Sequence, residues 1–467
     1  MNADTPLPTV AEAARAIAKG ELSPVALAEA ALARAERLDR QLHSFIRLTP
    51  DRAIAAATKA EREIAAGRSR GPLHGIPYGL KDIYDAAGLP TTAHSKLLLD
   101  NIAAADAATT ARLEDAGMVL IGKLATHEFA TGGPAFDLPW PPARNPWNTD
   151  HFTGGSSSGS GAAVAAGILP VALGTDTGGS IRLPAAFCGT VGLKPTYGRV
   201  SRRGVVPLSF SLDHCGPLTW TVEDCALVLQ ALAGHDPRDP GSADMPVPDY
   251  SASLRDGVSG LRIGYAKAFN TDGGVDREMA TALDDAAKLL GRLGAEIVEV
   301  EFPPVDHFNA CTRAISHTES FAIHQQDLRT RPGDYARVTR ERLMMGAFVS
   351  GGQYVQAQRL RRILTAKVDA LFQDCAALIA APIVAPAARL EDVETGPWRR
   401  QQPLTAMFNA TGHPALCLPC GLSTGGLPLS LQLVGRAFDE AGLLRIGHAY
   451  EQAAGWHLKR PPLATVA

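Results

Sequence analysis

Apolar residues recur every three or four positions through the first part of the chain, which is the spacing of one buried helix face. This pattern predicts a helix that ends at Gly20 and a second helix with Ser23 as its N-cap and Pro24 in its first turn. A third, alanine-rich helix is predicted over 51–66. We therefore expect residues 1–70 to form a helical N-terminal segment.

Downstream of this segment the pattern changes to short apolar runs separated by glycine and proline turns. The stretches GIPYGLKD, ATTARLEDAG and MVLIGKL predict a strand, a helix and a strand, an alternation typical of α/β folds. A similar unit follows a loop near 236–252 that is rich in proline and aspartate. We expect one domain over 1–467, with a core at 75–235. The rest of the sheet is expected at 255–467, with a helical insertion around 306–376.

The composition is that of an ordinary soluble protein, with 46% hydrophobic and 20% charged residues and a net charge of −3. This balance gives no electrostatic reason to expect a nucleic acid or an anionic membrane as partner. No apolar run approaches the ~20 residues of a membrane-spanning helix. The N-terminus has no secretory signal pattern, and the seven cysteines show no framework spacing, so we expect a cytoplasmic protein with reduced thiols.

Several familiar motifs occur in the sequence, but the residues around them do not fit the kind of site that each motif usually marks. The run Gly155–Gly159 fits G-x-S-x-G, but no buried strand precedes it, as a nucleophile elbow requires. The D-T-G at 176–178 matches half of an aspartic protease dyad, and the chain has no second copy. The histidines are dispersed, and the one C-x-x-C, from Cys417 to Cys420, lacks a zinc spacing and lies in an apolar stretch. We expect no metal site, and a structural role for the two cysteines.

Three other places carry polar residues suited to catalysis. Lys81 ends an apolar strand, where burial would remove its charge and let it act as a base near pH 7. A serine run at 156–158 lies between glycines just before a helix. Ser180 follows two glycines in GTDTGGS, a turn that could direct backbone N–H groups at one oxyanion. Taken singly, each has a structural alternative: a surface lysine, a helix N-cap and a chain-reversing turn.

Together and in this order, Lys81, the serine run and Ser180 resemble the amidase signature family. The resemblance continues through 180–204 and 211–234 and returns in FNATGHPALCLPCG and GLPLSLQLVG near the C-terminus. Residues 300–400 are the least diagnostic part. The resemblance implies the α/β fold of that family, a large central twisted mixed β-sheet covered by helices on both faces.

The resemblance also implies a Ser–cis-Ser–Lys triad that works through an acyl-enzyme. Ser180 matches the nucleophile, and Ser156 matches the serine that follows a cis peptide bond and relays a proton. Lys81 matches the general base, which must be buried and neutral. The carboxylate of the neighbouring Asp82 must then point elsewhere.

The residues around this triad receive roles from the same resemblance. The oxyanion hole would consist of the nucleophile's own N–H and the backbone N–H groups of Thr177, Gly178 and Gly179. Ser157 would support Lys81 by a hydrogen bond. Asp176 and Arg182 would hold the turn rather than touch the substrate.

The substrate pocket is expected around Ala130, Thr131, Gly132 and Gly155. The first three are small, which leaves room beside the nucleophile. Phe136, Trp140 and Trp147 follow in a proline-rich irregular segment, where they could line an apolar entrance or simply pack. An apolar or aromatic substrate is slightly favoured over a charged one.

The expected reaction is hydrolysis of a carboxamide C–N bond without metal or cofactor, and an ester, aryl amide or carbamate would suit the same chemistry. Alternatives are the A subunit of a glutamine-dependent tRNA amidotransferase, a carbamate- or urea-type amide hydrolase of a catabolic pathway, and a non-catalytic subunit. Against the amidotransferase, 330–400 lacks that subunit's tyrosine-rich helix and the composition has no basic bias. We expect a small-molecule acyl substrate and activity of the chain by itself, with a homodimer as an option.

Overall fold

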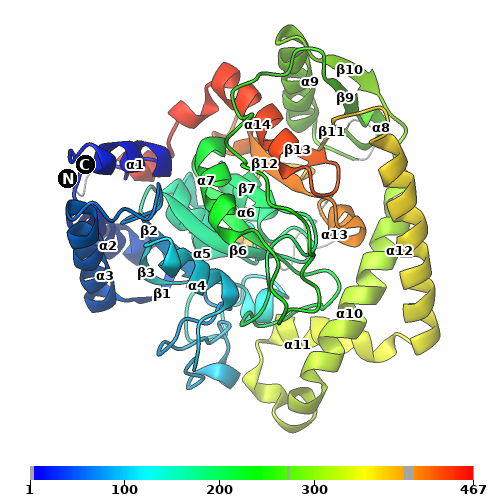
Figure 1. Cartoon of the computed structure of the whole chain (residues 1–467). Helices are drawn as coiled ribbons and strands as arrows, with labels where there is room; N and C mark the ends of the chain where they lie inside the picture. The colour runs from blue at the N-terminus through cyan, green and yellow to red at the C-terminus, as the bar shows by residue number, and fades with distance from the viewer. Residues whose placement is uncertain (1–4, 271–273, 394–403, 466–467) are drawn as a thin grey trace.

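The computed structural model describes residues 5–270, 274–393 and 404–465, and its centre is one eleven-stranded sheet (Figure 1). The strand order is β1-β3-β2-β6-β8-β7-β12-β13-β11-β9-β10. In chain order, the strands are β1 (Phe45–Leu48), β2 (Pro77–Lys81), β3 (Val119–Leu124), β6 (Val171–Asp176), β7 (Val191–Lys194), β8 (His214–Thr219), β9 (Arg262–Tyr265), β10 (Glu296–Glu299), β11 (Ala377–Ala380), β12 (Ala415–Leu422) and β13 (Pro428–Gly435). A separate hairpin joins β4 (Arg144–Asn145) to β5 (Asn148–Phe152).

The sheet is mixed, because its two ends and its middle pair differently. Strand β2 runs parallel to β3 and β6, and β9 runs parallel to β10 and β11. Between them, β6, β8, β7, β12, β13 and β11 pair antiparallel in turn. Helices surround this sheet (Figure 1), so the predicted fold class is confirmed.

The helices carry the connections between the strands. The α-helices are α1 (Val10–Ala18), α2 (Pro24–Leu42), α3 (Pro50–Ala65), α4 (Ala108–Asp115), α5 (Ser158–Ala165), α6 (Arg182–Cys188), α7 (Val222–Leu232), α8 (Lys267–Asn270), α9 (Arg277–Arg292), α10 (Val305–Thr330), α11 (Arg337–Met344), α12 (Gly351–Leu371), α13 (Met407–Thr411), α14 (Glu440–Ala454) and α15 (Pro462–Thr465). Short 3-10 turns are η1 (Lys96–Leu98), η2 (Glu128–Ala130), η3 (Pro332–Asp334), η4 (Met345–Phe348), η5 (Leu390–Asp392) and η7 (Trp456–Leu458).

The three N-terminal helices lie where the hydrophobic pattern predicted them. The Ser23 hydroxyl caps α2 by accepting the N–H groups of Val25 and Ala26, both at 3.1 Å. Strand β1 was not predicted, since its four residues are too short to show a pattern. It extends the sheet by pairing antiparallel with β3.

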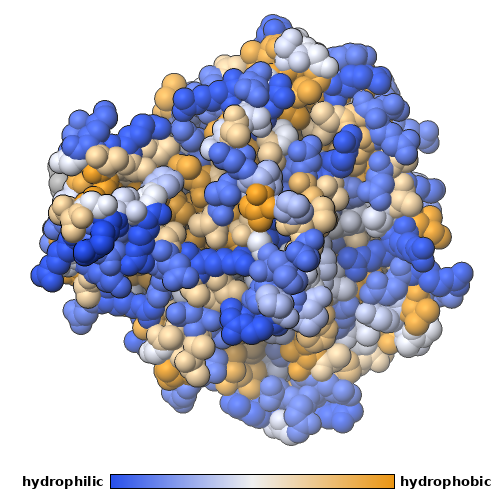
Figure 2. All heavy atoms as spheres, in the orientation of Figure 1, coloured by the Kyte–Doolittle hydropathy of each residue, from blue (hydrophilic) through white to orange (hydrophobic). Residues whose placement is uncertain are grey.

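Helices α10, α11 and α12 lie together at one side of the sheet (Figure 1). On the face shown in Figure 2, hydrophilic residues are interspersed with scattered hydrophobic ones. The seven cysteines are free and buried, with Cys417 and Cys420 on β12. Within the described ranges, no helix combines the length and the apolar character needed to cross a bilayer.

Candidate active site

The strand order brings the polar ends of two neighbouring strands together. Strands β2 and β6 pair in parallel, with Leu80 opposite Leu173. Parallel strands end at the same edge of a sheet, so Lys81 at the end of β2 lies beside Thr175 and Asp176 at the end of β6. The segment just before α5 and the turn just before α6 also lie at this edge of the sheet.

Lys81 is buried and contacts two hydroxyl groups. Its Nζ lies 2.7 Å from Ser156 Oγ and 2.8 Å from Thr175 Oγ1. Burial lowers the pKa of Lys81 to about 7, although the carboxylates of Asp176 and Asp213 act in the opposite direction. The neutral amine, which has a lone pair, is therefore populated near neutral pH. An amine in that state can accept a proton from Ser156.

Asp82 follows Lys81 in sequence but points to other partners. Its carboxylate forms a buried ion pair with Lys123, with 2.8 Å between Lys123 Nζ and Asp82 Oδ1. Its second oxygen accepts the backbone N–H of Thr92 at 3.0 Å. This arrangement ties the charge of Asp82 to β3, as the sequence required for a neutral Lys81.

The turn before α5 contains a cis peptide bond between Gly155 and Ser156. The Ser156 carbonyl accepts the N–H groups of His127 (3.0 Å) and Ser158 (2.8 Å). A Cβ on Gly155 would lie 2.1 Å from the His127 ring, so only glycine fits there. Gly155, expected among the substrate contacts, thus packs against His127.

The turn that carries Ser180 adjoins the Ser156 turn. The Ser157 N–H donates to the Ser180 carbonyl at 3.2 Å. Gly179 has φ +131°, and a Cβ there would lie 2.1 Å from Thr405 Oγ1. The Thr405 hydroxyl also donates to the Gly178 carbonyl at 2.7 Å. Ser180 is partly exposed, whereas Ser156 is buried.

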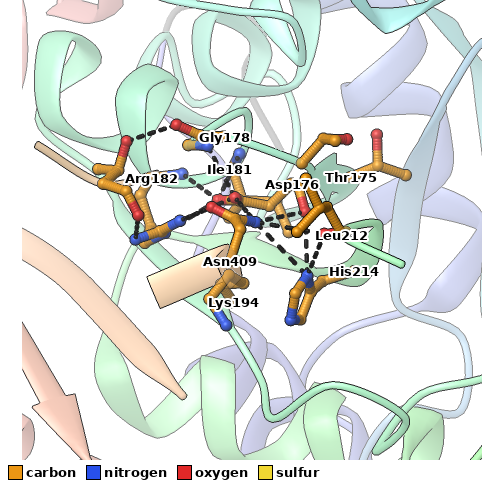
Figure 3. A network of polar contacts seen from close by, with 12 residues as sticks. Thr175, Asp176, Gly178, Ile181, Arg182, Lys194, Leu212, His214 and Asn409 are labelled. Carbon is orange, nitrogen blue, oxygen red and sulfur yellow. Dashed lines mark hydrogen bonds and ion pairs between the residues drawn. The ribbon is translucent and has the colours of Figure 1, made fainter. Parts of the chain in front are cut away.

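Asp176 and Arg182 form the centre of the network in Figure 3. Asp176 accepts the N–H groups of Gly179 (2.8 Å) and Ile181 (3.2 Å), and its Oδ1 lies 2.8 Å from the Arg182 guanidinium. Burial opposes ionisation of Asp176, but Arg182 and Asn409 outweigh it and hold the pKa of this carboxyl well below its usual range. Asp176 thus connects the turn before Ser180 to Arg182 by hydrogen bonds and an ion pair.

Arg182 extends the same network to the C-terminal part of the chain. Its guanidinium donates to the Thr405 carbonyl (2.8 Å), Asn409 Oδ1 (2.7 Å) and Gln432 Oε1 (2.7 Å). Asn409 in turn donates to the Asp176 carbonyl at 2.8 Å. Segments more than two hundred residues apart therefore fix the geometry of one short turn.

The predicted oxyanion donors differ in their hydrogen bonds. The N–H of Gly179 already donates to Asp176. The N–H groups of Thr177, Gly178 and Ser180 have no protein acceptor among the described residues. Three donors thus stay available for a developing oxyanion at this turn.

Ser157 reaches Lys81 only through Thr175. Its hydroxyl accepts the Thr175 N–H at 3.2 Å and lies 3.3 Å from the Thr175 carbonyl. Thr175, which sequence reasoning missed, supplies the second hydroxyl that contacts Lys81, beside that of Ser156. Asp213 was missed too, although it accepts the Thr177 hydroxyl at 2.6 Å. The available signal was the presence of polar residues at one end of each of two runs whose other end is apolar, VALGTD and SLDHCGPL.

A pocket of about 500 Å³ lies beside Thr175 and Thr177. Its polar lining includes Tyr197, Arg202 and Asp213. Its apolar wall consists of Ile83, Ala130, Val205, Val206, Leu208 and Phe210.

The other residues expected around the substrate lie elsewhere. Gly132 faces Thr339, since a Cβ on this glycine would lie 2.9 Å from Thr339 Oγ1, and Thr131 beside it is partly exposed. Phe136 is 60% exposed, and Trp147 donates its indole N–H to the Cys188 carbonyl at 2.8 Å. Trp140, Phe136 and Trp147 are not among the residues that line the pocket. The apolar wall comes from 205–210 instead.

The chain is similar to known proteins over nearly its whole length. A family model described as amidase matches residues 26–444. An amidase of Pseudomonas putida is 44% identical, over 97% of this chain and 98% of that protein. The A subunit of the glutamyl-tRNA(Gln) amidotransferase of Chloroflexus aggregans is 42% identical, over 98% of both chains. The solved peptide amidase of Stenotrophomonas maltophilia, 34% identical over 97% of this chain and 98% of that one, superposes with a TM-score of 0.86. This chain therefore belongs to the amidase family and is an amide-hydrolysing enzyme.

Proposed function

We propose that this enzyme hydrolyses the carboxamide bond of a small molecule through an acyl-enzyme on Ser180. The observation that carries the proposal is the buried contact between Lys81 and Ser156 at 2.7 Å, with the pKa of Lys81 lowered to about 7 by burial. A neutral amine beside a serine hydroxyl provides the base that an unactivated serine lacks.

In the first half of the reaction, Ser180 Oγ attacks the substrate carbonyl carbon. Its proton passes to Ser156, whose own proton passes to Lys81. The negative charge on the substrate oxygen is then stabilised by N–H groups of the 177–180 turn. When the C–N bond breaks, the nitrogen leaves with a proton returned from Lys81 through Ser156, and the acyl group stays on Ser180.

In the second half, water replaces the amine. Lys81, neutral again, takes a proton from water through Ser156, and the resulting hydroxide attacks the ester carbonyl of the acyl-enzyme. Collapse of this intermediate releases the carboxylic acid, and the Ser180 oxygen takes back a proton from Lys81 through Ser156, which leaves Lys81 neutral for the next cycle. The Asp176–Arg182 network supports both halves because it fixes the N–H groups before any charge develops.

The pocket beside Thr177 favours an apolar or aromatic acyl group. Its apolar wall comes from Ile83, Ala130 and 205–210. At its rim, Arg202 is already engaged, with its guanidinium 3.4 Å from Asp239 and 4.7 Å from the centre of the Tyr197 ring. Arg203 and Arg238 line the pocket too, and their guanidinium groups lie 2.9 and 3.8 Å from Asp236, so each of these three arginines has a carboxylate partner.

The A subunit of a tRNA amidotransferase is the second candidate, favoured by the 42% identity to such a subunit. Identity does not separate it from an amidase, because a named amidase is 44% identical over a similar length. Helix α12 contains a single tyrosine, Tyr354, and the net charge of −3 gives no basic bias. A carbamate hydrolase would use the same residues and differ only in the acyl group.

The deciding experiment is product release by the purified chain alone. The panel contains primary amides, anilides, aryl esters, aryl carbamates and glutamine, with Ser180→Ala and Lys81→Ala as controls. Turnover of an amide that disappears in both variants supports the proposal, and the best acyl group distinguishes amide from carbamate. Ammonia release from glutamine and no other substrate, and only when a partner protein is present, would favour the amidotransferase instead.

A further inference from the structure

Glu319 lies on α10, in the part of the chain whose sequence is least diagnostic, yet its carboxylate is buried and fully engaged. It is 6% exposed. One oxygen accepts the Ser211 N–H at 3.1 Å and the Ser209 hydroxyl. The other accepts the Ser211 hydroxyl at 2.7 Å and the Tyr354 hydroxyl at 2.9 Å. We call these four residues the Glu319 cluster.

The cluster holds a loop that belongs to the pocket. Leu208 and Phe210, next to the two serines, form part of the pocket's apolar wall. Phe210 is 55% exposed, so its own packing does little to fix the loop. Hydrogen bonds to a charged carboxylate are stronger than those between neutral groups, so Glu319 is one of the main anchors of this wall.

Asp213 holds the other end of the same loop. Its Oδ2 accepts the N–H groups of Leu208 (2.9 Å) and Ser209 (3.0 Å). Its Oδ1 accepts the hydroxyl of Thr177, the first residue of the oxyanion turn, at 2.6 Å. The loop is thus fixed between Glu319 on the insertion and the turn that precedes Ser180.

The insertion makes one further contact with the loop. Arg361 on α12 donates to the Ser211 carbonyl at 2.9 Å. Tyr354, which donates to Glu319, also lies on α12. Both α10, through Glu319, and α12, through Arg361 and Tyr354, therefore take part in holding the loop. The position of the loop therefore depends on how α10 and α12 pack.

We propose that Glu319 is a positioning residue that sets the width of the substrate pocket and so selects the size of the acyl group. It acts through Ser209 and Ser211 and touches no reacting atom. The inference rests on the proposed function, in which this pocket receives the acyl group. Without the Glu319 carboxylate, the loop that contains Leu208 and Phe210 moves outward. A large acyl group then loses more contacts with the pocket wall than a small one does.

The test compares Glu319→Ala with Glu319→Gln. Glutamine can place its oxygen toward the Ser211 N–H, and its NH2 can donate to hydroxyl oxygens that tolerate either role. Alanine leaves the Ser211 N–H without an acceptor. Glu341→Ala on α11 is the matched control, because it removes a carboxylate from the same insertion where the side chain is 47% exposed.

Two measurements are made on each variant. The first is hydrogen–deuterium exchange of peptides that cover 205–216, which does not depend on activity. We expect about tenfold faster exchange in Glu319→Ala, little change in Glu319→Gln and none in Glu341→Ala. The second is kcat and KM for an acetyl and a benzoyl anilide. We expect KM for the benzoyl substrate to rise about tenfold more than that for the acetyl substrate, with recovery in Glu319→Gln.

The two measurements separate the two proposals. If the wild-type chain hydrolyses no substrate but the exchange pattern is as expected, the proposed function fails and Glu319 still positions the loop. Unchanged exchange at 205–216 in a folded variant would overturn the inference. An equal loss on both anilides would also overturn it, because that is the result of a merely destabilised enzyme. If Glu319→Ala does not fold, Tyr354→Phe, which removes one donor from the cluster, is expected to give the same changes at smaller size.

Discussion

Lys81, Ser156, Thr175, Asp176, Arg182 and the 177–180 turn form what we call the Lys81 network. This network and the Glu319 cluster are both buried and polar, and both lie next to the same pocket. They differ in how clearly the sequence alone indicates them. Around Lys81 and Ser180 the backbone itself is specialised, and glycines are required where a Cβ would meet another group within about 2 Å. Around Glu319 an ordinary helix presents one carboxylate to ordinary loop serines. The arrangement around Lys81 and Ser180 therefore requires particular residues that can be recognised in the sequence. The pocket wall is instead held by contacts of Glu319 that have no local motif.

The same contrast applies to how the two networks tolerate change. Apart from the Asn409 amide, the donors to the Asp176 carboxylate are backbone N–H groups and the Arg182 guanidinium, which cannot act as acceptors. Three of the four donors to Glu319 are hydroxyls, which can also accept. Substitutions should accordingly be severe in the first region and graded in the second.

The largest effect is expected for Ser180, the proposed nucleophile. Ser180→Ala should lower kcat/KM by about 10⁴-fold or more, because no other group can form the acyl-enzyme. Lys81→Ala should cause a loss of similar order, since the serine then lacks its base. The check is steady-state kinetics on the best amide, with circular dichroism to show an intact fold. Retention of more than a small fraction of activity in Ser180→Ala would place the nucleophile elsewhere and remove one side of the comparison.

Loss of the charge of Asp176 should be the next largest effect. Asp176→Asn leaves the buried Arg182 guanidinium without its counter-ion, which should lower the free energy of unfolding by about 3 kcal/mol. Urea denaturation at pH 7 measures this directly. Glu223→Gln is the control, because Glu223 pairs with Arg15 and Arg255 near the surface and should change stability by less than about 1 kcal/mol. Equal effects of the two variants would contradict the role given to the buried pair.

Gly178 and Gly179, which are neighbours in the 177–180 turn, allow a more specific test, and the expected loss of activity is of similar size. Gly179→Ala places a Cβ 2.1 Å from Thr405 Oγ1 at φ +131°, so the turn must move, and kcat should fall about 10²-fold. Gly178→Ala places its Cβ 3.9 Å from Ala406 Cβ, which is an ordinary contact, and should cause a much smaller loss. The pair is compared by kcat on one amide. If Gly178→Ala were the more damaging of the two, the turn would not be fixed as the structure has it.

The differing outcomes of sequence prediction have the same physical origin. The N-terminal helices were predictable because Ser23 and Pro24 are local start signals. The Lys81, Ser156 and Ser180 positions were singled out because each lies at a recognisable local feature, a strand end or a glycine turn. Contacts that close across long sequence separation, such as Glu319 with Ser211, leave no periodicity and no motif.

For the aromatic residues of the proline-rich segment, the sequence left two alternatives open, an apolar entrance or plain packing. Phe136, Trp140 and Trp147 are conspicuous in the sequence, yet the pocket wall is built mainly from valines, a leucine and Phe210. Trp147 instead satisfies its indole N–H on the Cys188 carbonyl at 2.8 Å, and Phe136 lies on the surface. Which side of a loop an aromatic residue faces depends on packing that its own sequence does not encode.

The smallest expected effect is a shift in pH dependence, and it separates the two regions most directly. The pKa of Lys81 is lowered by burial to about 7, so kcat/KM should fall about tenfold per pH unit below that value. The carboxylate of Asp213 acts to raise the pKa of Lys81, so Asp213→Asn should move the acid limb to lower pH, by about half a unit. Glu319→Gln should leave the limb where it is.

The pH dependence of the free energy of unfolding also depends on the pKa of Lys81, and it can be measured without a substrate. An unfolded lysine titrates near 10.5, so between pH 7 and 10.5 the unfolded chain binds more protons at Lys81 than the folded chain does. The free energy of unfolding contributed by Lys81 therefore rises with pH over that interval. Lys81→Met removes this dependence, and its advantage in urea midpoint over the wild type should be largest at about pH 6 to 7 and shrink towards about pH 10. A constant difference across that range would mean that Lys81 keeps its charge in the folded enzyme, and the base would have to be sought outside the Lys81 network.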